Sequence, residues 1–133
     1  MDVIAVIAQK GGTGKTTLTL ALAVAAQLAG KVTAIVDLDP QASASNWSDR
    51  REMDSPVVVS AQPARLPHVL TSAEASGAAL VLIDTPPRAE QAALAAAKAA
   101  HLILIGCPSH TDEFPTAFQR ILTFHLPIRY IFS

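Results

Sequence analysis

The chain has 133 residues, of which 50% are hydrophobic and 16% are charged, so it has the size and composition of one folded domain (1–133) and not of a disordered segment. The net charge of −1 excludes a general basic surface for nucleic acid, and the single cysteine excludes an internal disulfide, which fits a reducing cytoplasm. No apolar run reaches the roughly 18 residues that span a bilayer. We therefore expect a cytoplasmic domain with no membrane association.

A glycine- and lysine-rich loop, residues 9–17 (QKGGTGKTT), directly follows the apolar run Val3–Ala8. Because glycine has no Cβ, successive backbone N–H groups can turn inward there and form a nest for phosphate oxygens. The apolar segment that follows predicts a helix from about Gly14 to Ala29, whose positive dipole end faces the bound anion. This order of strand, loop and helix predicts a P-loop, with Lys15 on the phosphates and Thr16 on Mg²⁺. The expected phosphate-binding residues are Gly11, Gly12, Thr13, Gly14, Lys15, Thr16 and Thr17.

The loop departs from the usual Walker A spacing, which requires glycine at position 9, where this chain has Gln9. The segment Lys10–Lys15 instead carries a lysine at both ends, so Lys10 supplies a second cation that points away from or across the bound phosphates. The alternative interpretation of such a cluster is a flexible solvated turn. The apolar strand before the loop and the apolar helix after it favour phosphate binding.

Short apolar runs alternate with helical segments along the rest of the chain, which predicts an α/β fold with a doubly wound, mostly parallel sheet. Most runs are apolar without alternation, as expected of strands that are covered on both faces. The expected strands after the first are Val32–Asp37, Val57–Ser60, Leu80–Asp84, His101–Gly106 and Leu126–Phe132. The expected helices after the first are Ala42–Arg51, Leu66–Ala75, Arg88–Ala100 and Thr111–Phe124, and Gly30 is the expected C′ residue of the first helix.

The last expected strand ends one residue before the end of the chain. A sheet of this architecture normally continues with a covering helix and a return connection. We therefore expect a form of the fold that is truncated at its C-terminus.

Two carboxylates, Asp37 and Asp39, stand at the end of the second expected strand, in the sequence DLDPQ. Side chains two residues apart lie on the same side of an extended chain, and this edge of an open α/β sheet is where ligands bind. The pattern by itself is also typical of a turn followed by a helix N-cap. Together with the loop, it favours a role in binding Mg²⁺ or in orienting water.

The run Leu80–Ile83 closes on Asp84, followed by Thr85, Pro86 and Pro87. An apolar strand that delivers one aspartate has the Walker B form, in which the carboxylate serves the Mg²⁺ site, usually through a water molecule. The alternative is a strand that ends in an ordinary turn. The three segments together form a strong pattern for a P-loop NTPase.

With these three segments the chain resembles the ParA/MinD family of deviant Walker A ATPases, and specifically the short ParA-type partition proteins. The resemblance rests on residues 10–17 (KGGTGKTT), 37–41 (DLDPQ) and 83–87 (IDTPP). It implies a homodimer that encloses a pair of ATP molecules, with ATP and Mg²⁺ as cofactors. Lys10 would be the signature lysine that reaches the partner's nucleotide and Asp39 would orient the attacking water, while Asp84 would serve the Mg²⁺ site.

The resemblance also implies a function and partners. The first expectation is an ATPase that partitions plasmid or chromosomal DNA and is stimulated by a centromere-binding partner protein. Similar proteins continue with an adenine-contacting loop and with helices that bind nonspecific DNA, so DNA binding would depend on that further region. Two alternatives stay open: a truncated nucleotide-binding remnant without productive turnover, and a cargo-positioning ATPase of the MinD type, which would need a terminal amphipathic helix.

Overall fold

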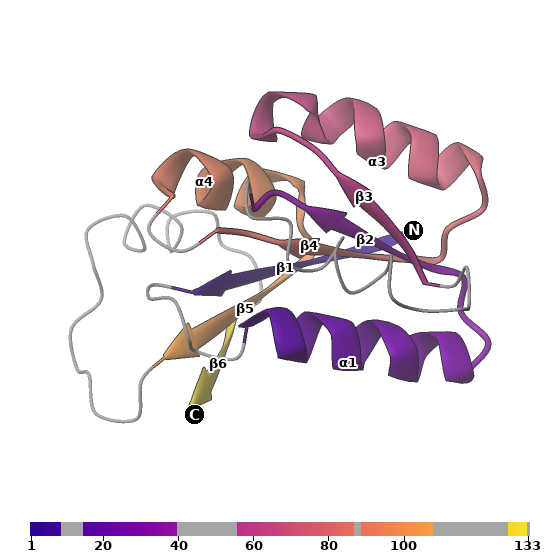
Figure 1. Cartoon of the computed structure of the whole chain (residues 1–133), viewed down its shortest axis with the longest axis horizontal. Coiled ribbons are helices and arrows are strands. Elements are labelled where there is room, and N and C mark those ends of the chain that lie inside the picture. Colours follow the sequence, from indigo (N-terminus) through magenta and orange to yellow (C-terminus); the bar gives the residue numbers. More distant parts are fainter. Residues whose placement is uncertain (9–14, 40–55, 87–88, 108–127, 133) are drawn as a thin grey trace.

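The computed structural model of the chain describes residues 1–8, 15–39, 56–86, 89–107 and 128–132 (Figure 1). In these parts the chain forms one six-stranded sheet with the strand order β3-β2-β4-β1-β5-β6, and all of its strand pairs are parallel. The strands are β1 (Asp2–Ala8), β2 (Thr33–Asp37), β3 (Val57–Ser60), β4 (Leu80–Asp84), β5 (Leu102–Cys107) and β6 (Ile128–Phe132). The predicted parallel α/β fold is therefore confirmed.

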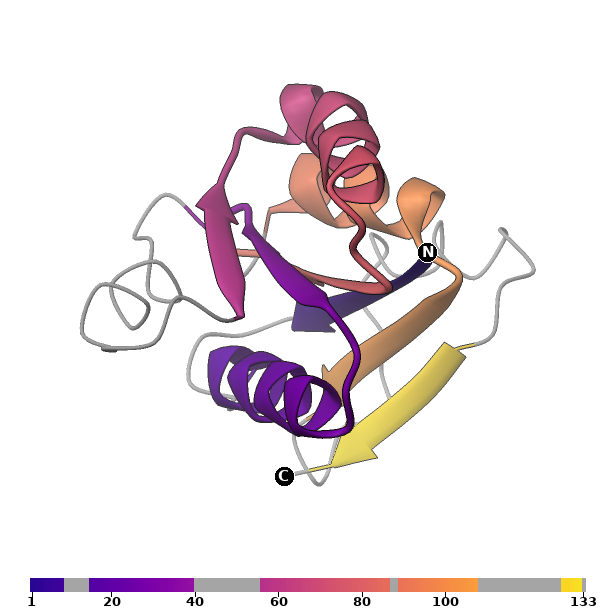
Figure 2. The same cartoon turned by 90° about the vertical axis from the view of Figure 1, so that its right-hand side faces the viewer.

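Helices cover both faces of this sheet, as a doubly wound fold requires. Figure 2 shows α1 on one side and α3 and α4 on the other. The helices are α1 (Lys15–Leu28), the short 3₁₀ helix η1 (Pro63–Arg65), α3 (Leu66–Ala75) and α4 (Glu90–Ala99). The expected helices Ala42–Arg51 and Thr111–Phe124 lie outside the described residues.

Each face of the sheet has its own apolar layer. On the α1 side, Ile35 and Leu82 pack with Ala23 of the helix. On the other side, the alternate strand residues, such as Val36 and Ile83, pack under α3 and α4. Because both sets of side chains are buried, the strands are apolar without alternation, as predicted.

Two helices end in the same way, with a glycine in the left-handed region. After α1, Gly30 has φ of 87°, its N–H donates to the Gln27 carbonyl oxygen, and the Lys31 N–H donates to the Ala26 carbonyl oxygen. This is the Schellman arrangement, and it confirms Gly30 as the C′ residue. Gly77, with φ of 91°, ends α3 with the equivalent pair of bonds.

Several predicted boundaries were wrong by one or two residues, each for a local reason. The first helix ends at Leu28 and not at Ala29, because the Schellman turn begins there. The helix expected over Arg88–Ala100 begins at Glu90 and ends at Ala99, since Ala89 and Ala100 have extended backbone conformations. Val32 and His101 precede their strands, whereas Cys107 belongs to β5.

His101 nevertheless fastens the start of β5 to β1. Its backbone N–H donates to the Val3 carbonyl oxygen at 2.8 Å, and its Nδ1 accepts the Val3 N–H at 3.0 Å.

Among the described residues, no helix is both long and apolar enough to cross a membrane.

Candidate functional site

The three sequence segments that predicted a nucleotide site meet at one edge of the sheet. Strands β1, β2 and β4 are adjacent and parallel, so their carboxyl ends lie side by side. In register, Asp84 is paired with Asp37 on one side and with Val6 on the other. Residues 9–14 follow β1 from this edge, and Lys15 begins α1 beyond them.

Asp84 is the last residue of β4 and is fully buried. It lies two residues after Leu82, which packs against α1, so its carboxyl group is on the α1 face of the sheet. This is the face from which the helix that carries Lys15 and Thr16 approaches. The structure thus places Asp84 on the sheet face that α1 covers, and its role at a Mg²⁺ site stays a prediction.

Asp37 and Asp39 take different positions at the end of β2. Asp37 is almost fully buried, whereas Asp39 is half-buried just beyond the strand. The Asp39 N–H donates to Asp37 Oδ1 at 3.0 Å, and the N–H of Leu38 donates to the Asp84 carbonyl oxygen at 2.9 Å. The Asp37–Asp39 segment is therefore held by its own first carboxylate and by β4.

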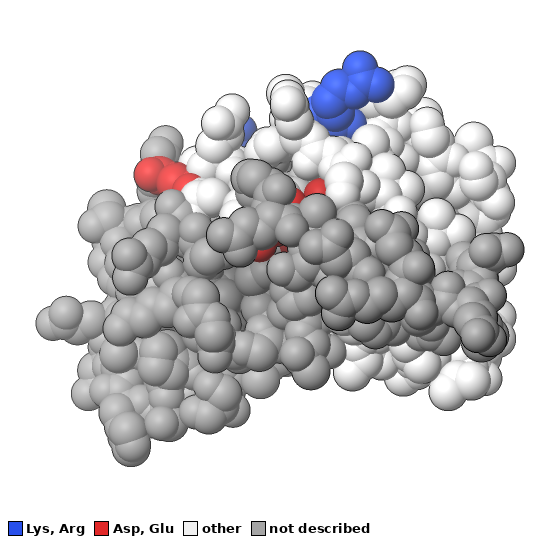
Figure 3. Space-filling model, in the orientation of Figure 1, with Lys and Arg blue, Asp and Glu red and all other residues white. Residues whose placement is uncertain are grey.

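An open hollow of about 650 Å³ lies beside Asp39, between the ends of β2 and β3 and the start of η1. Its polar lining is Asp37, Asp39, Ser60, Gln62 and Arg65. In the space-filling view of Figure 3, acidic side chains are visible at the left and, between grey atoms, near the middle of the molecule, and the visible basic side chains lie over α3 and α4. Asp39 thus faces a space large enough for water and polar groups.

Thr85 is a residue of this edge to which the sequence analysis gave no role. It directly follows Asp84, its side chain is fully buried, and Oγ1 donates to the Val6 carbonyl oxygen at 3.0 Å. The sequence signal is a hydroxyl residue directly after the strand aspartate. Its partner is 79 residues away in the chain, so the bond itself could not be read from the sequence.

The loop residues are placed only in part. Lys10, Gly11, Gly12, Thr13 and Gly14 lie outside the described residues. Lys15, Thr16 and Thr17 form the first turn of α1, with their backbone described. The roles of their side chains remain predictions.

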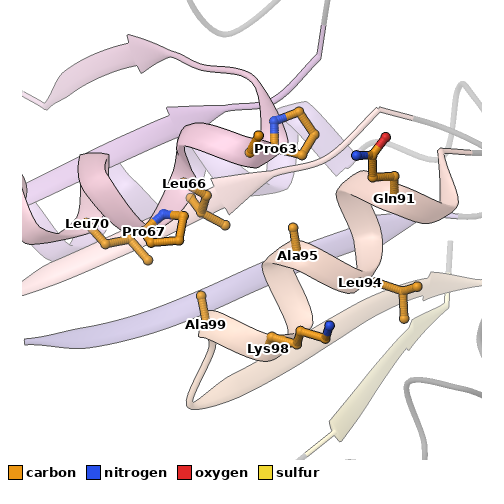
Figure 4. Close-up of a pocket in the computed structure, with 10 residues that line it drawn as sticks. Pro63, Leu66, Pro67, Leu70, Gln91, Leu94, Ala95, Lys98 and Ala99 are labelled. Atoms are coloured by element: carbon orange, nitrogen blue, oxygen red, sulfur yellow. The ribbon is translucent and has the colours of Figure 1, made fainter.

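A second groove, of about 640 Å³, lies between α3 and α4 (Figure 4). Its lining is apolar except for Gln91 and Lys98. It includes none of the residues that were expected at the nucleotide site. The labelled residues that line it are Pro63, Leu66, Pro67, Leu70, Gln91, Leu94, Ala95, Lys98 and Ala99.

The donor atoms at the edge with Asp84 suit a hard cation. Within the described parts of the chain, no group of three or more His, Cys, Asp or Glu side chains could hold a metal ion by itself. Mg²⁺ in nucleotide sites is bound by one or two carboxylates together with substrate phosphates and waters. The buried carboxylates of Asp84 and Asp37, on the face where α1 begins, fit such a shared site and not a closed metal cage.

Comparison with known proteins finds similarity to nucleotide-binding domains. Residues 4–123 match the family described as CobQ/CobB/MinD/ParA nucleotide binding domain. Maintenance of carboxysome distribution protein A from Gloeobacter kilaueensis is 43% identical over 95 residues, which cover 71% of this chain and 43% of that protein. The chain thus matches less than half the length of that relative.

Solved structures share the fold at low sequence identity. Cobyrinic acid a,c-diamide synthase from Mycobacterium smegmatis, solved with ADP and magnesium, has a TM-score of 0.77 at 20% identity, over 99% of this chain and 74% of that chain. The septum site-determining protein MinD from Pyrococcus horikoshii, complexed with Mg-ADP, has a TM-score of 0.77 at 20% identity, over 98% and 69%. These likenesses establish the fold.

Proposed function

Because the chain belongs to the CobQ/CobB/MinD/ParA nucleotide-binding domain family, we propose that it is an ATP- and Mg²⁺-dependent dimer switch of the ParA type. The observation that carries the proposal is the register of the sheet. Asp84 lies directly between Val6 of β1, which leads into the glycine-rich loop, and Asp37 of β2, which precedes Asp39. The three segments that carry the predicted site residues therefore follow strands whose carboxyl ends lie side by side, which supports the proposal.

Each predicted site residue has a distinct task in this proposal. Backbone N–H groups of residues 11–14 and the start of α1 bind the phosphates, and Lys15 adds a positive charge. Thr16 and Asp84 hold Mg²⁺, Asp84 through a water molecule. When bound, the ion neutralises charge on the β- and γ-phosphate oxygens.

Hydrolysis then depends on two further residues. Asp39 accepts a hydrogen bond from the attacking water and holds it in line with the γ-phosphate, and its place beside the open hollow supports this task. Lys10 crosses to the nucleotide of the partner subunit, where its charge stabilises the transferring phosphoryl group. The switch is thus a homodimer that forms only with ATP bound.

We propose that the switch partitions plasmid or chromosomal DNA together with a centromere-binding partner protein. A protein assembly is a second candidate cargo, because the 43% identical relative is named for the distribution of carboxysomes. In that case the same cycle positions a protein assembly. The two cargoes would use the same nucleotide site and would differ in the partner that stimulates hydrolysis.

The proposal is tested by light scattering after size exclusion, with the full chain and its Asp39→Ala variant, each with and without Mg-ATP. The variant should bind ATP, lose hydrolysis and change from the monomer mass of 13.9 kDa to about twice that value. Lys15→Ala, which cannot hold the phosphates, is the matched control and should stay monomeric. A monomer in every condition, with ATP bound, would instead indicate a nucleotide-binding remnant without a productive cycle.

The cargo classes are separated by a second measurement on the trapped dimer. Partition of DNA requires retention on nonspecific double-stranded DNA in a mobility-shift assay with Mg-ATP, and this retention should weaken steeply with salt. Pelleting with anionic liposomes would indicate membrane positioning of the MinD kind. Retention on neither would favour a switch that acts directly on a protein cargo.

A further inference from the structure

The buried hydroxyl of Thr85 makes a hydrogen bond that has no part in the cycle proposed above. Its Oγ1 donates to the Val6 carbonyl oxygen at 3.0 Å, and its side chain has no exposed surface. Val6 lies in β1, two residues before the strand ends at Ala8. The bond therefore joins the segment that carries Asp84 to the strand that leads into the glycine-rich loop.

This bond lies where the ladder between the two strands stops. The paired positions of β1 and β4 end at Val6 and Asp84. Beyond this point Ile7 and Ala8 are paired only with β5, on the other side of β1. Thr85 directly follows β4, so its hydroxyl adds a contact to β1 at Val6, the last position at which β1 is paired with β4.

Packing alone does not call for a hydroxyl at this position. Thr85 is fully buried, and valine would fill nearly the same volume as threonine without a hydroxyl. A buried hydroxyl is unfavourable unless a hydrogen bond compensates for its lost hydration. The presence of threonine is therefore best explained by the bond to Val6 and by what that bond positions.

Mg²⁺ binding requires a defined relative position of the ends of β1 and β4. The ion requires near-octahedral geometry with ligand distances of about 2.0–2.1 Å. In the proposed site, one ligand, Thr16, is reached through β1 and the loop, whereas Asp84, which would hold a water ligand of the ion, is on β4. The distance between Thr16 and Asp84 therefore depends on how the end of β1 is held against the end of β4.

We propose that Thr85 is a positioning residue for the magnesium site, which fixes the end of β1 that leads into the loop relative to Asp84. The inference rests on the proposed function, because it assumes that Mg-nucleotide binds at this edge. Loss of the hydroxyl should weaken the contribution of Mg²⁺ to nucleotide affinity and leave the metal-independent affinity nearly unchanged.

The test compares Thr85→Val, which removes the hydroxyl and keeps the shape, with Thr85→Ser, which keeps the hydroxyl. For each full-length variant, the Kd of a fluorescent ADP analogue is measured in MgCl₂ and in EDTA. The ratio of the two Kd values gives the magnesium contribution. A hydrogen bond of about 0.5–1.5 kcal/mol corresponds to a loss of about two- to tenfold in this ratio. We expect this loss in the Thr85→Val variant. The Thr85→Ser variant should have a ratio of Kd values near that of wild type.

Thermal unfolding of the nucleotide-free variants separates positioning from a purely structural role. If Thr85→Val does not fold, Thr85→Ala provides a second variant without the hydroxyl. An unchanged magnesium contribution in a folded hydroxyl-free variant would overturn the positioning role, as would an equal loss in the serine variant. If wild type itself shows no effect of Mg²⁺ on ADP affinity, the proposed function fails and the inference fails with it.

Discussion

Asp37 and Asp84 are direct register neighbours at the carboxyl ends of the adjacent parallel strands β2 and β4, and both are almost fully buried. Paired residues of a parallel ladder point to the same face, so both carboxyl groups lie on the side that α1 covers. The Asp84 carbonyl oxygen accepts the Leu38 N–H, and Asp37 Oδ1 accepts the Asp39 N–H. The position of Asp39 is thus set from the strand that carries Asp84.

This relationship predicts different results for two substitutions of Asp37. Asp37→Asn retains an oxygen that can accept the Asp39 N–H, whereas Asp37→Ala removes it. We expect Asp37→Ala to lower the free energy of unfolding by about 1–3 kcal/mol, as for other lost buried hydrogen-bond partners. ATP turnover should fall further in the alanine variant than in the asparagine variant. Urea unfolding and steady-state phosphate release measure the two effects, and equal behaviour of the two variants would contradict the role of the oxygen.

Asp84→Asn should remove the dependence of nucleotide binding on Mg²⁺. The amide keeps the size of the side chain but not the negative charge that favours a hard cation. In EDTA the variant should bind ADP at least as tightly as wild type, because a buried negative charge near the phosphates has been removed. Asp2→Asn, an exposed residue at the opposite end of β1, is the matched control and should change neither value. The measurement is a pair of titrations with and without MgCl₂.

Lys15→Ala should weaken ATP binding by at least about 100-fold. A charge-assisted contact to phosphate contributes about 1.5–3 kcal/mol, and this lysine is expected to make more than one. Lys31→Ala is the matched control, because Lys31 is exposed and follows the far end of α1. Isothermal titration with ATP measures both variants. If Lys15→Ala binds ATP as tightly as wild type, the assignment of residues 9–17 as a phosphate-binding loop is wrong.

The apolar layer under α3 predicts the effect of a core substitution. Leu66 is 1% exposed and packs in the layer on the α3 and α4 side of the sheet, whereas Leu28 at the end of α1 is 83% exposed. Leu66→Ala should lower the free energy of unfolding by about 2–5 kcal/mol, because it leaves a cavity. Leu28→Ala should change it by less than about 0.5 kcal/mol. Urea unfolding monitored by circular dichroism distinguishes the two, and similar losses would contradict the assigned packing.

Local patterns in the sequence predicted most of this architecture. The strands Val57–Ser60 and Leu80–Asp84 and the helix Leu66–Ala75 have the expected bounds, because apolar runs and flanking turn residues mark both of their ends. Gly30 was recognisable as a helix terminus, since a left-handed C′ position favours glycine. The location of Asp84 at the carboxyl end of the sheet followed from its place at the end of an apolar run.

What the sequence could not predict are contacts between distant segments. The Thr85 bond to Val6 spans 79 positions, and the His101 bond to Val3 spans 98 positions. Neither residue belongs to a local pattern that indicates its partner. The sequence also could not predict the different positions of Asp37 and Asp39, which depend on the folded end of the strand. Asp37 accepts a backbone hydrogen bond, whereas Asp39 lies beside the hollow.

The strand order has a consequence for the sequence of events during synthesis. β1 is made first, but its neighbours in the sheet are β4 and β5, which begin at Leu80 and Leu102. The glycine-rich loop therefore leaves the ribosome before the strands that pair with β1 have been made. Non-local pairing of this kind is slow, and it exposes strand edges until it is complete. We expect the nascent chain to acquire nucleotide affinity abruptly and late, once β5 has emerged to close the sheet around β1.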